Sequence, residues 1–279
     1  MKKIIIIGKN SYIASGIANY FDNFSTIKYL THNNWKKNIN DLIEADYILN
    51  FCIEPDFSTN DNSIKNNIDY QIANSIQFSN AKLVFISSRK VYGTSNSLII
   101  HKEDDHLSYF DIYSKKKILL ENSLKEILGD NLLILRISNV IGTPIFRNSY
   151  KTFIGWISSN YICNGKLMVN QNVESVKDFV TTDYIQSCIY KLVCKNATGA
   201  FNLSAGFGIS VKDVIEGYVG KENIVYGDNI CIDPADQFIL DNAKLIDVVE
   251  QKINREDIDN KLLSYREILS NLRLKYMIS

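Results

Sequence analysis

Four consecutive isoleucines, Ile4–Ile7, lie near the start of the chain and are followed by Gly8. Isoleucine is β-branched and packs better in a sheet than in a helix. An unbroken apolar run, unlike an alternating one, is typical of a parallel strand that is covered on both faces. These residues therefore predict a buried strand in an α/β fold. The run is too short for a signal peptide, and no later stretch is long enough to span a membrane.

Strand and helix patterns alternate after this first strand, which predicts βαβ units and a Rossmann-like, doubly wound parallel sheet. The further strands are expected at 27–30, 47–53, 83–86, 132–137 and 199–203, and the helices at 13–21, 35–44, 63–78, 113–128 and 258–274. The pattern is less regular after Pro144. We therefore expect a Rossmann domain in residues 1–144 and a smaller C-terminal substrate-binding lobe in 145–279, some of whose elements return to the first domain.

Charge and cysteine content exclude several classes of protein. Lys and Arg total 31, as do Asp and Glu, so no basic excess favours binding to nucleic acid. The five cysteines form no CxxC pair, and the three histidines are scattered, so no metal site is expected. Cysteines without a disulfide framework are typical of a reducing compartment, and we expect a cytoplasmic protein.

The turn after the first strand is where a sheet of this kind approaches the pyrophosphate of a dinucleotide. Gly8, Ser11 and Ala14 occupy the glycine positions of a GxxGxxG pattern, and only the first is glycine. Serine and alanine are small enough for close backbone approach, although a strand followed by any helix could show the same pattern. The residues expected to bind the cofactor here are Gly8, Lys9, Ser11, Tyr12 and Ile13.

The residues after the second strand indicate which cofactor is bound. An acidic residue there would bind the ribose 2′-hydroxyl of NAD, whereas a basic residue accommodates the 2′-phosphate of NADP. The sequence has Thr31 and His32, with no carboxylate before Asp41, and Lys9 lies in the glycine turn. We therefore expect NADP, with Thr31 and His32 among its contacts, and keep NAD as the alternative.

Tyr113 is followed four residues later by Lys117, a spacing that places both side chains on one face of a helix. A cation beside a tyrosine favours the phenolate, which suits the tyrosine to acid–base catalysis. Ser88 ends an apolar strand and could hydrogen-bond a substrate carbonyl near Tyr113. Either pattern alone occurs by chance in ordinary helices and loops.

Several segments, in order, resemble the extended short-chain dehydrogenase/reductase family, specifically its sugar-nucleotide epimerases, dehydratases and reductases. The segments are 85–93 (FISSRKVYG), 113–117 (YSKKK), 135–142 (LRISNVIG), 177–183 (KDFVTTD), 199–203 (GAFNL) and 238–245 (FILDNAKL). The family's third strand and the helix beside it are expected to be shortened or missing, because few residues separate the segments predicted as strands at 27–30 and 47–53.

The resemblance implies a role for each matching residue. Tyr113 would donate or accept the proton, Lys117 would hold the nicotinamide ribose, and Ser88 would orient the reacting oxygen. Asn139 would contact a nucleotide-sugar substrate, as would Lys177, which replaces the family's arginine. The family also forms homodimers through helices, which here would use the 64–76 isoleucine stripe and the outer face of the Tyr113 helix, unless both pack on the chain's own sheet.

The positions after Ser88 separate the reactions of this family. Dehydratases carry Asp-Glu there and fucose-synthase-like epimerase–reductases carry a cysteine, whereas this chain has Arg89 and Lys90. A lone Ser–Tyr–Lys set fits reduction of a nucleotide-activated keto-sugar, and we expect an NDP-6-deoxy-4-keto-hexose 4-reductase. The alternatives are an NDP-sugar 4-epimerase that retains NAD and a non-catalytic protein that senses the dinucleotide.

Overall fold

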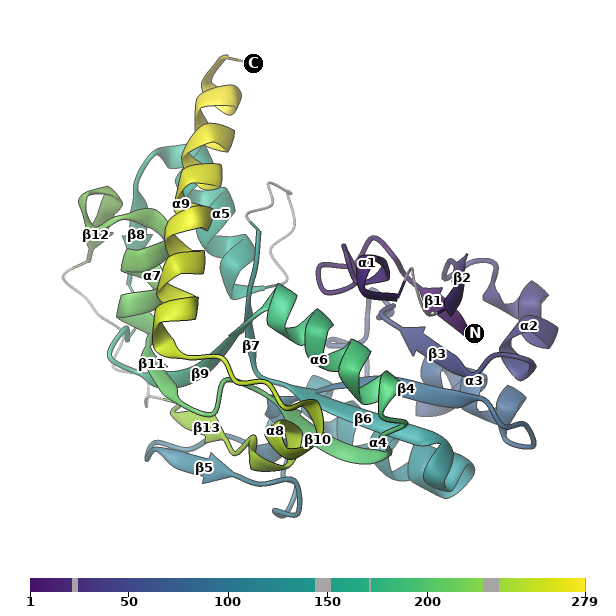
Figure 1. Cartoon of the computed structure of the whole chain (residues 1–279). Coiled ribbons are helices and arrows are strands. Elements are labelled where there is room, and N and C mark those ends of the chain that lie inside the picture. The colour runs from purple at the N-terminus through teal and green to yellow at the C-terminus, as the bar shows by residue number, and fades with distance from the viewer. Residues whose placement is uncertain (22–24, 144–151, 171, 228–235, 279) are drawn as a thin grey trace.

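The computed structural model describes residues 1–21, 25–143, 152–170, 172–227 and 236–278. A six-stranded sheet lies at its centre, in the order β10-β6-β4-β3-β1-β2, and every neighbouring pair is parallel (Figure 1). The strands are β1 (Lys2–Ile7), β2 (Ser25–Leu30), β3 (Tyr47–Asn50), β4 (Lys82–Ser88), β6 (Leu132–Ile137) and β10 (Gly199–Leu203). The predicted parallel, Rossmann-like sheet is thus confirmed.

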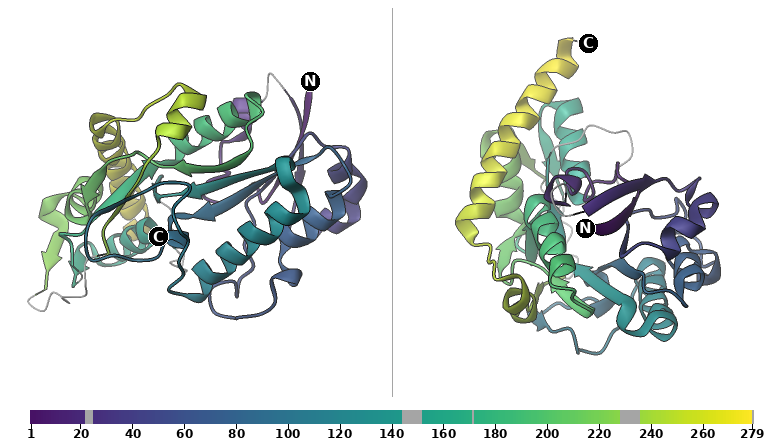
Figure 2. Two further views of the ribbon diagram at one scale, coloured as in Figure 1. Left: turned by 90° about the horizontal axis from the view of Figure 1, so that it is seen from below. Right: turned by 45° about the vertical axis from the view of Figure 1, so that its right-hand side comes forward.

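Helices cover both faces of this sheet, which is why the isoleucine run is unbroken. Ile4 and Ile6 join one core with α1 (Ala18–Phe21), α6 (Thr182–Cys194) and α8 (Ala243–Val249). Ile5 and Ile7 join the other core with α2 (Ile39–Ile43), α3 (Ile68–Ile76) and α4 (Ile112–Leu128). Figure 2 shows α4 and α6 on opposite sides of the strands. Successive strand residues face opposite ways, so both faces require apolar side chains.

Strand β2 is the outermost strand on its side of the sheet. Within the described part of the chain, no strand pairs with its outer edge, and a short 3-10 helix, η1 (Trp35–Asn38), leads from it into α2. Only η1 and α2 lie between β2 and β3, where the family's third strand and its helix were expected to be shortened or missing. As a consequence, the turn after β2 lies at the open edge of the sheet.

Three predicted segments differ from the observed elements. The helix expected at 13–21 is present only as α1, because Gly16 adopts φ +94° and interrupts the helical turn. The strand expected at 47–53 ends at Asn50, and the helix expected at 63–78 divides into η2 (Ile64–Asn66) and α3. The division lies at Asn67, whose side chain accepts hydrogen bonds from the first backbone N–H groups of α3.

The second half of the chain forms a lobe and also contributes to the central sheet. Strands from this half, β9 (Val176–Thr181), β11 (Gly208–Ser210) and β13 (Phe238–Leu240), form one sheet, with which β5 (Ile99–His101) and β7 (Asn139–Ile141) also pair. A separate two-stranded sheet consists of β8 (Leu167–Val169) and β12 (Ile224–Tyr226). The helix expected at 258–274 is found as α9 (Arg255–Ile278), which packs beside α5 (Phe153–Asn164) and α7 (Val211–Val219). The remaining 3-10 helices are η3 (Arg89–Tyr92), η4 (Gly129–Asn131) and η5 (Lys221–Asn223).

The boundary expected at residue 144 lies outside the described residues. Strand β10 nevertheless pairs with β6 in the central sheet, and α6 and α8 cover one of its faces, so the later half of the chain contributes to both parts. None of the helices described could cross a membrane.

The isoleucine stripe of α3 packs on the chain's own sheet. Ile68, Ile72 and Ile76 are at most 2% exposed and belong to the core beneath α3 and α4. The stripe is therefore not available as a surface for a second subunit. On the outer face of α4, Leu119 is exposed, and the homodimer stays a prediction.

Candidate functional site

A cavity of about 620 Å³ lies at the carboxyl ends of β1, β2 and β3. Its lining includes five of the residues predicted to bind the cofactor. These are Gly8, Lys9, Ser11, Thr31 and His32. The side chains of Phe51 and Cys52 close its inner side, and Tyr29 lies beside Lys9.

Gly8 has a backbone conformation and a neighbourhood that only glycine tolerates. Its φ is +83°, and a Cβ atom built on it would lie 2.7 Å from the sulfur of Cys52. The Ser11 amide donates a 2.9 Å hydrogen bond to the Gly8 carbonyl, and the Ser11 hydroxyl accepts one from the Ala14 amide. The turn is therefore packed against Cys52, just after the end of β3. Residues 8–11 of the turn line the cavity, where a ligand could contact them.

Tyr12 and Ile13, also predicted to bind the cofactor, do not line this cavity. The Tyr12 ring lies against Gly142, where an added Cβ would be 2.6 Å from the Tyr12 hydroxyl. The carbonyl of Ile13 accepts a hydrogen bond from the Gln186 side chain of α6. Because the turn does not continue into a helix at once, these residues face α6 rather than the ends of the strands.

The charges around the cavity are basic. No Asp or Glu is among its lining residues, whereas Lys9 and His32 are. The Lys9 ammonium lies 5.2 Å from the centre of the Tyr29 ring and forms no ion pair with any residue that the structure describes. Asp41, the first carboxylate after β2, pairs with Lys28 at 2.7 Å. That carboxylate is therefore already neutralised by a lysine of the same region.

Ser88 and Tyr113 lie on β4 and α4, which are in contact with each other. Ser88 ends β4, and its hydroxyl accepts a 3.3 Å hydrogen bond from the Lys90 amide at the start of η3. Tyr113 is in the first turn of α4, which Asp111 caps through a capping box with Ser114. The cap fixes where α4 begins, and so fixes the position of Tyr113 as the second residue of the helix.

Lys117 lies one helical turn after Tyr113 and is 3% exposed. Its ammonium is 5.7 Å from the centre of the Tyr113 ring and donates a 2.7 Å hydrogen bond to the Ile86 carbonyl of β4. The helical face predicted from the four-residue spacing is thus observed. Phe57 packs edge-on against Tyr113, with ring centres 5.5 Å apart, and limits the rotation of its ring.

Sequence reasoning missed Asp69, a buried carboxylate on α3 that faces this lysine. Asp69 accepts a 2.7 Å hydrogen bond from the Asn50 amide, at the end of β3. Burial raises the pKa of Asp69 to about 6, and the charge of Lys117 opposes that rise. The signal was an aspartate beside Ile68 on the apolar face of the predicted helix, where a charged side chain needs a partner.

A second charged cluster joins η3 to the C-terminal lobe. Arg89 pairs with Asp236 at 2.7 Å, and Lys177 approaches the same carboxylate at 3.7 Å. Lys90 pairs instead with Asp111 at 2.9 Å. Burial lowers the pKa of Lys177, and Asp236 opposes that effect.

Asn139 and Lys177, the predicted substrate-binding residues, lie on the adjacent strands β7 and β9. The Asn139 side chain donates a 3.1 Å hydrogen bond to the carbonyl of Asp178, so it is held against β9 rather than free to turn. Both residues are half-buried. Strands β7 and β9 are paired in the sheet that also contains β13, and the guanidinium of Arg89 lies over the ring of Phe238 in β13.

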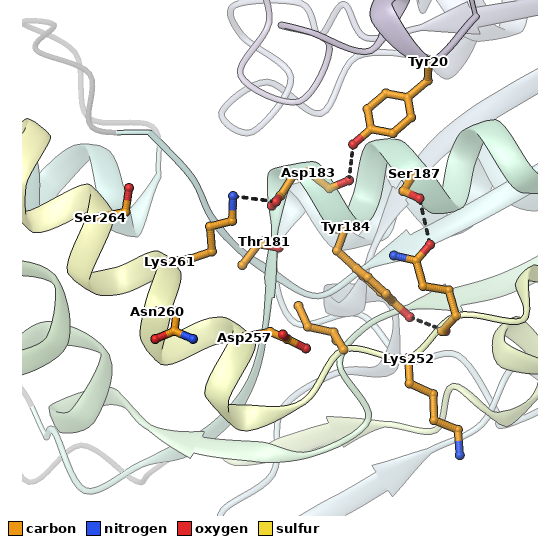
Figure 3. Close-up of a pocket in the computed structure, with 12 residues that line it drawn as sticks. Tyr20, Thr181, Asp183, Tyr184, Ser187, Lys252, Asp257, Asn260, Lys261 and Ser264 are labelled. Carbon is orange, nitrogen blue, oxygen red and sulfur yellow. Dashed lines mark hydrogen bonds and ion pairs between the residues drawn. The ribbon is translucent and has the colours of Figure 1, made fainter.

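Another cavity, of about 550 Å³, lies between α6 and α9 (Figure 3). Lys261 and Asp183 pair across it at 2.8 Å, and the Tyr20 hydroxyl donates to the Asp183 carbonyl. None of the predicted site residues lines it. Within the described ranges, no three His, Cys, Asp or Glu side chains are grouped closely enough to hold a metal ion.

Comparisons with known proteins bear on these features. Residues 4–203 match the NAD dependent epimerase/dehydratase family, and a search of curated proteins finds no match. The fold is similar to UDP-N-acetylglucosamine 4-epimerase from Methanobrevibacter ruminantium M1, solved in complex with UDP-N-acetylmuramic acid. That structure is 20% identical, with a TM-score of 0.76 over 99% of this chain and 98% of the other.

Two further structures have the same fold with different cofactors bound. The dTDP-glucose 4,6-dehydratase from Bacillus anthracis, in complex with NAD, is 15% identical, with a TM-score of 0.75 over 99% of this chain and 100% of the other. RMD from Pseudomonas aeruginosa, complexed with NADPH, is 16% identical, with a TM-score of 0.72 over 99% and 100%. At these identities the likeness concerns the fold alone.

Proposed function

Because this chain belongs to the NAD-dependent epimerase/dehydratase family, and so is an NAD(P)-dependent enzyme of the extended short-chain dehydrogenase/reductase type, we propose that it reduces the 4-keto group of a nucleotide-activated 6-deoxyhexose with NADPH. The observation that carries the proposal is that the two positions after Ser88 are occupied by basic side chains that are already paired. Arg89 and Lys90 are each paired with a carboxylate, Asp236 and Asp111. Neither can act as the carboxylic acid–base pair that dehydratases of this family carry there.

The residues that remain suit a single proton transfer. The Ser88 hydroxyl hydrogen-bonds the carbonyl oxygen of the sugar, and Tyr113 donates a proton to that oxygen. Lys117, close to the Tyr113 ring, stabilises the phenolate that is left. When bound, the reduced nicotinamide supplies the hydride that the carbonyl carbon receives. One hydride and one proton convert the ketone to an alcohol, and the cofactor is oxidised.

The preference for NADPH rests on the cavity at the ends of β1, β2 and β3. Gly8 allows the turn after β1 to pack closely on Cys52, and the turn lines the cavity, where a turn of this kind in a doubly wound sheet approaches a pyrophosphate. Lys9 supplies a positive charge there, and no carboxylate lines the cavity to bind a ribose 2′-hydroxyl. A 2′-phosphate is therefore the better electrostatic match.

The same serine, tyrosine and lysine could serve an NDP-sugar 4-epimerase that retains NAD, so the experiment must separate the two. One portion of the purified protein is denatured to release and identify any bound cofactor, and a separate native portion is titrated with NADPH and with NADH. NDP-4-keto-6-deoxyhexoses with different nucleobases are supplied next, and the absorbance of reduced nicotinamide is followed.

Stoichiometric consumption of NADPH with formation of the 4-hydroxy sugar supports the reductase. Retained NAD, together with interconversion of the two C4 epimers of an NDP-hexose without net use of cofactor, replaces it with the epimerase. If neither cofactor binds, both enzymatic assignments are wrong, and a dinucleotide sensor is then excluded as well.

A further inference from the structure

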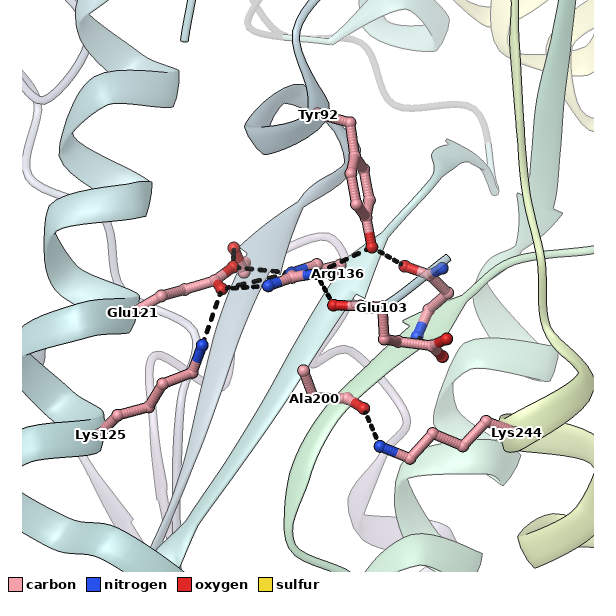
Figure 4. A network of polar contacts seen from close by, with 9 residues as sticks. Tyr92, Glu103, Glu121, Lys125, Arg136, Ala200 and Lys244 are labelled. Carbon is pink, nitrogen blue, oxygen red and sulfur yellow. Dashed lines mark hydrogen bonds and ion pairs between the residues drawn. The ribbon is translucent and has the colours of Figure 1, made fainter. Parts of the chain in front are cut away.

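A buried network of charged and polar side chains lies between α4 and the central sheet (Figure 4). At its centre Arg136 of β6 pairs with Glu121 of α4, and the two side chains are 2% and 0% exposed. The guanidinium donates through two nitrogens to both carboxylate oxygens, at 2.7, 3.1 and 3.2 Å. A bidentate pair of this kind fixes the direction of both side chains as well as their distance.

The network holds the segment that carries Ser88 from both sides. The Ser87 hydroxyl donates a 2.6 Å hydrogen bond to Glu121. The guanidinium of Arg136 donates a 2.9 Å hydrogen bond to the Tyr92 hydroxyl, which in turn donates to the side chain of Asn202 at 2.7 Å. In the sequence, Ser88 therefore lies between Ser87 and Tyr92, each of which is hydrogen-bonded to one member of the ion pair.

The network also holds the helix that carries Tyr113. Glu121 is one turn after Lys117 and two turns after Tyr113, so the three residues lie along one face of α4. Lys117 donates to the carbonyl of Ile86, and Glu121 accepts from Ser87. Consecutive residues of β4 are thus bonded to consecutive turns of α4, which fixes the position of the helix along the strand.

We propose that Glu121, held in place by Arg136, is a positioning residue, which acts through its hydrogen bond with Ser87 and sets the placement of Tyr113 and Lys117 relative to Ser88. The proposal rests on the roles assigned to these three residues under the proposed function. A well-packed apolar pair could hold α4 on the sheet at no cost in stability, because burying two charges is itself expensive. The ion pair instead fixes the position of α4 along β6. Apolar side chains allow a helix to slide along a strand, whereas a bidentate pair does not.

A purely structural role predicts a different outcome from a positioning role. If the network only stabilises the fold, weakening it lowers the unfolding temperature and leaves the active fraction with full activity. If it positions Tyr113, a variant that is still folded loses kcat, because a displacement of about 1 Å at a reacting group can cost on the order of a hundredfold in rate. The cavity at the ends of β1, β2 and β3 is not part of α4, so KM and the Kd of NADPH should change much less than kcat.

The test uses Ser87→Ala, which removes the bond between β4 and Glu121 and leaves the buried ion pair intact. The matched control is Ser158→Ala, because Ser158 is also buried and also hydrogen-bonded to an element beside its own, Tyr218 of α7, but lies on α5 of the other lobe. Ser87→Thr, which restores a hydroxyl, should recover most of the lost activity. Glu121→Gln serves as a second variant and leaves Arg136 without its counter-charge, so its folding is checked first by circular dichroism.

Kinetics give the first readout. We expect Ser87→Ala to lower kcat about ten- to a hundredfold, with KM and the Kd of NADPH within about twofold of the wild type. Ser158→Ala should keep the wild-type kcat. Equal loss in both variants, or a Ser87→Ala enzyme that is less stable but fully active, would overturn the positioning role.

A spectroscopic readout decides the question even without a known substrate. The ¹³C chemical shift of the Tyr113 ζ carbon is followed at one pH by NMR of protein labelled at that carbon, and its signal is assigned with Tyr113→Phe. If Ser87→Ala lets α4 move relative to β4, the surroundings of the Tyr113 ring change and its signal moves from the wild-type position, whereas Ser158→Ala leaves it in place. A Tyr113 signal that is unchanged in Ser87→Ala overturns the proposal. Failure of the proposed function instead shows as a wild-type enzyme without NADPH-dependent turnover, whatever Tyr113 does.

Discussion

The ammonium group of Lys117 lies 2.7 Å from the carbonyl oxygen of Ile86, two residues before Ser88. This contact joins the face of α4 that carries Tyr113 and Lys117 to the end of β4, with the ammonium 5.7 Å from the Tyr113 ring centre. The pair of residues recognised from a four-residue spacing is thus held by the sheet as well as by the helix. Replacing Lys117 by an uncharged side chain without a donor would remove both the hydrogen bond to Ile86 and the positive charge near the Tyr113 ring.

Replacing Lys117 by methionine should lower kcat about a hundred- to ten-thousandfold, the range typical of losing support for an acid–base group. Methionine is similar to lysine in length, and it removes both the charge, which lies over the Phe85 ring, and the hydrogen bond to the Ile86 carbonyl. The control is Lys116→Met, because Lys116 is its neighbour, is also buried and also lies over Phe57. Initial rates with saturating NADPH and keto-sugar measure the effect, and comparable losses in both variants would contradict the assignment of Lys117.

Replacing Gly8 by alanine should abolish cofactor binding and destabilise the fold. The φ of +83° costs an L-residue about 1–2 kcal/mol, and the new Cβ would also collide with Cys52. Gly199→Ala is the matched control, since Gly199 has the same φ of +83° with nothing within 4 Å of the added atom. Thermal unfolding and NADPH titration separate the two effects. If both variants bind NADPH normally, the turn after β1 is not the pyrophosphate site.

Replacing Lys9 by alanine should weaken NADPH binding about tenfold and leave NADH binding within about twofold, because only NADPH carries the 2′-phosphate. Lys28→Ala is the comparison, since Lys28 lies on the adjoining β2 but is paired with Asp41. Isothermal titration with both cofactors gives the ratio. An equal loss for NADPH and NADH would mean that Lys9 contacts the shared pyrophosphate and does not select NADP.

Asp69 should make the protein less stable as the pH rises through its folded-state pKa of about 6. The pKa is raised above the ordinary value of 3.8, so the folded state favours the neutral carboxyl group. Its contribution is fully present below pH 3.8 and is lost as the pH rises through about 6. Asp69→Asn cannot ionise, so its stability relative to the wild type should improve by about 2 kcal/mol between pH 4.5 and 7.5.

Urea unfolding of the two proteins at several pH values measures that difference. The comparison between variant and wild type cancels the other titrating groups, which are common to both. A difference in unfolding free energy that stays constant from pH 4.5 to 7.5 would show that Asp69 is already ionised in the folded protein at the lower pH, held so by Lys117.

The sequence by itself determined the parallel sheet and the helical face of Tyr113 and Lys117. Both are local or periodic properties, since a run such as Ile4–Ile7 can only be buried between two layers and a spacing of four residues fixes a helical face. The sequence also indicated the missing strand beyond β2, because too few residues separate the two strands. It did not indicate that α1 starts only at Ala18, because the spacing of the apolar residues in 13–21 does not show that Gly16 adopts a φ of +94°.

Only the tertiary structure decided which charges meet. Asp236 is far in sequence from Arg89, Glu121 from Ser87, and Asp69 from Lys117, yet each pair is in contact or in strong electrostatic interaction. No periodicity predicts such pairs, because they depend on how separate strands and helices are ordered and placed. The physical reason is that a buried charge must find its partner through space, and the sequence records only that the charge is there.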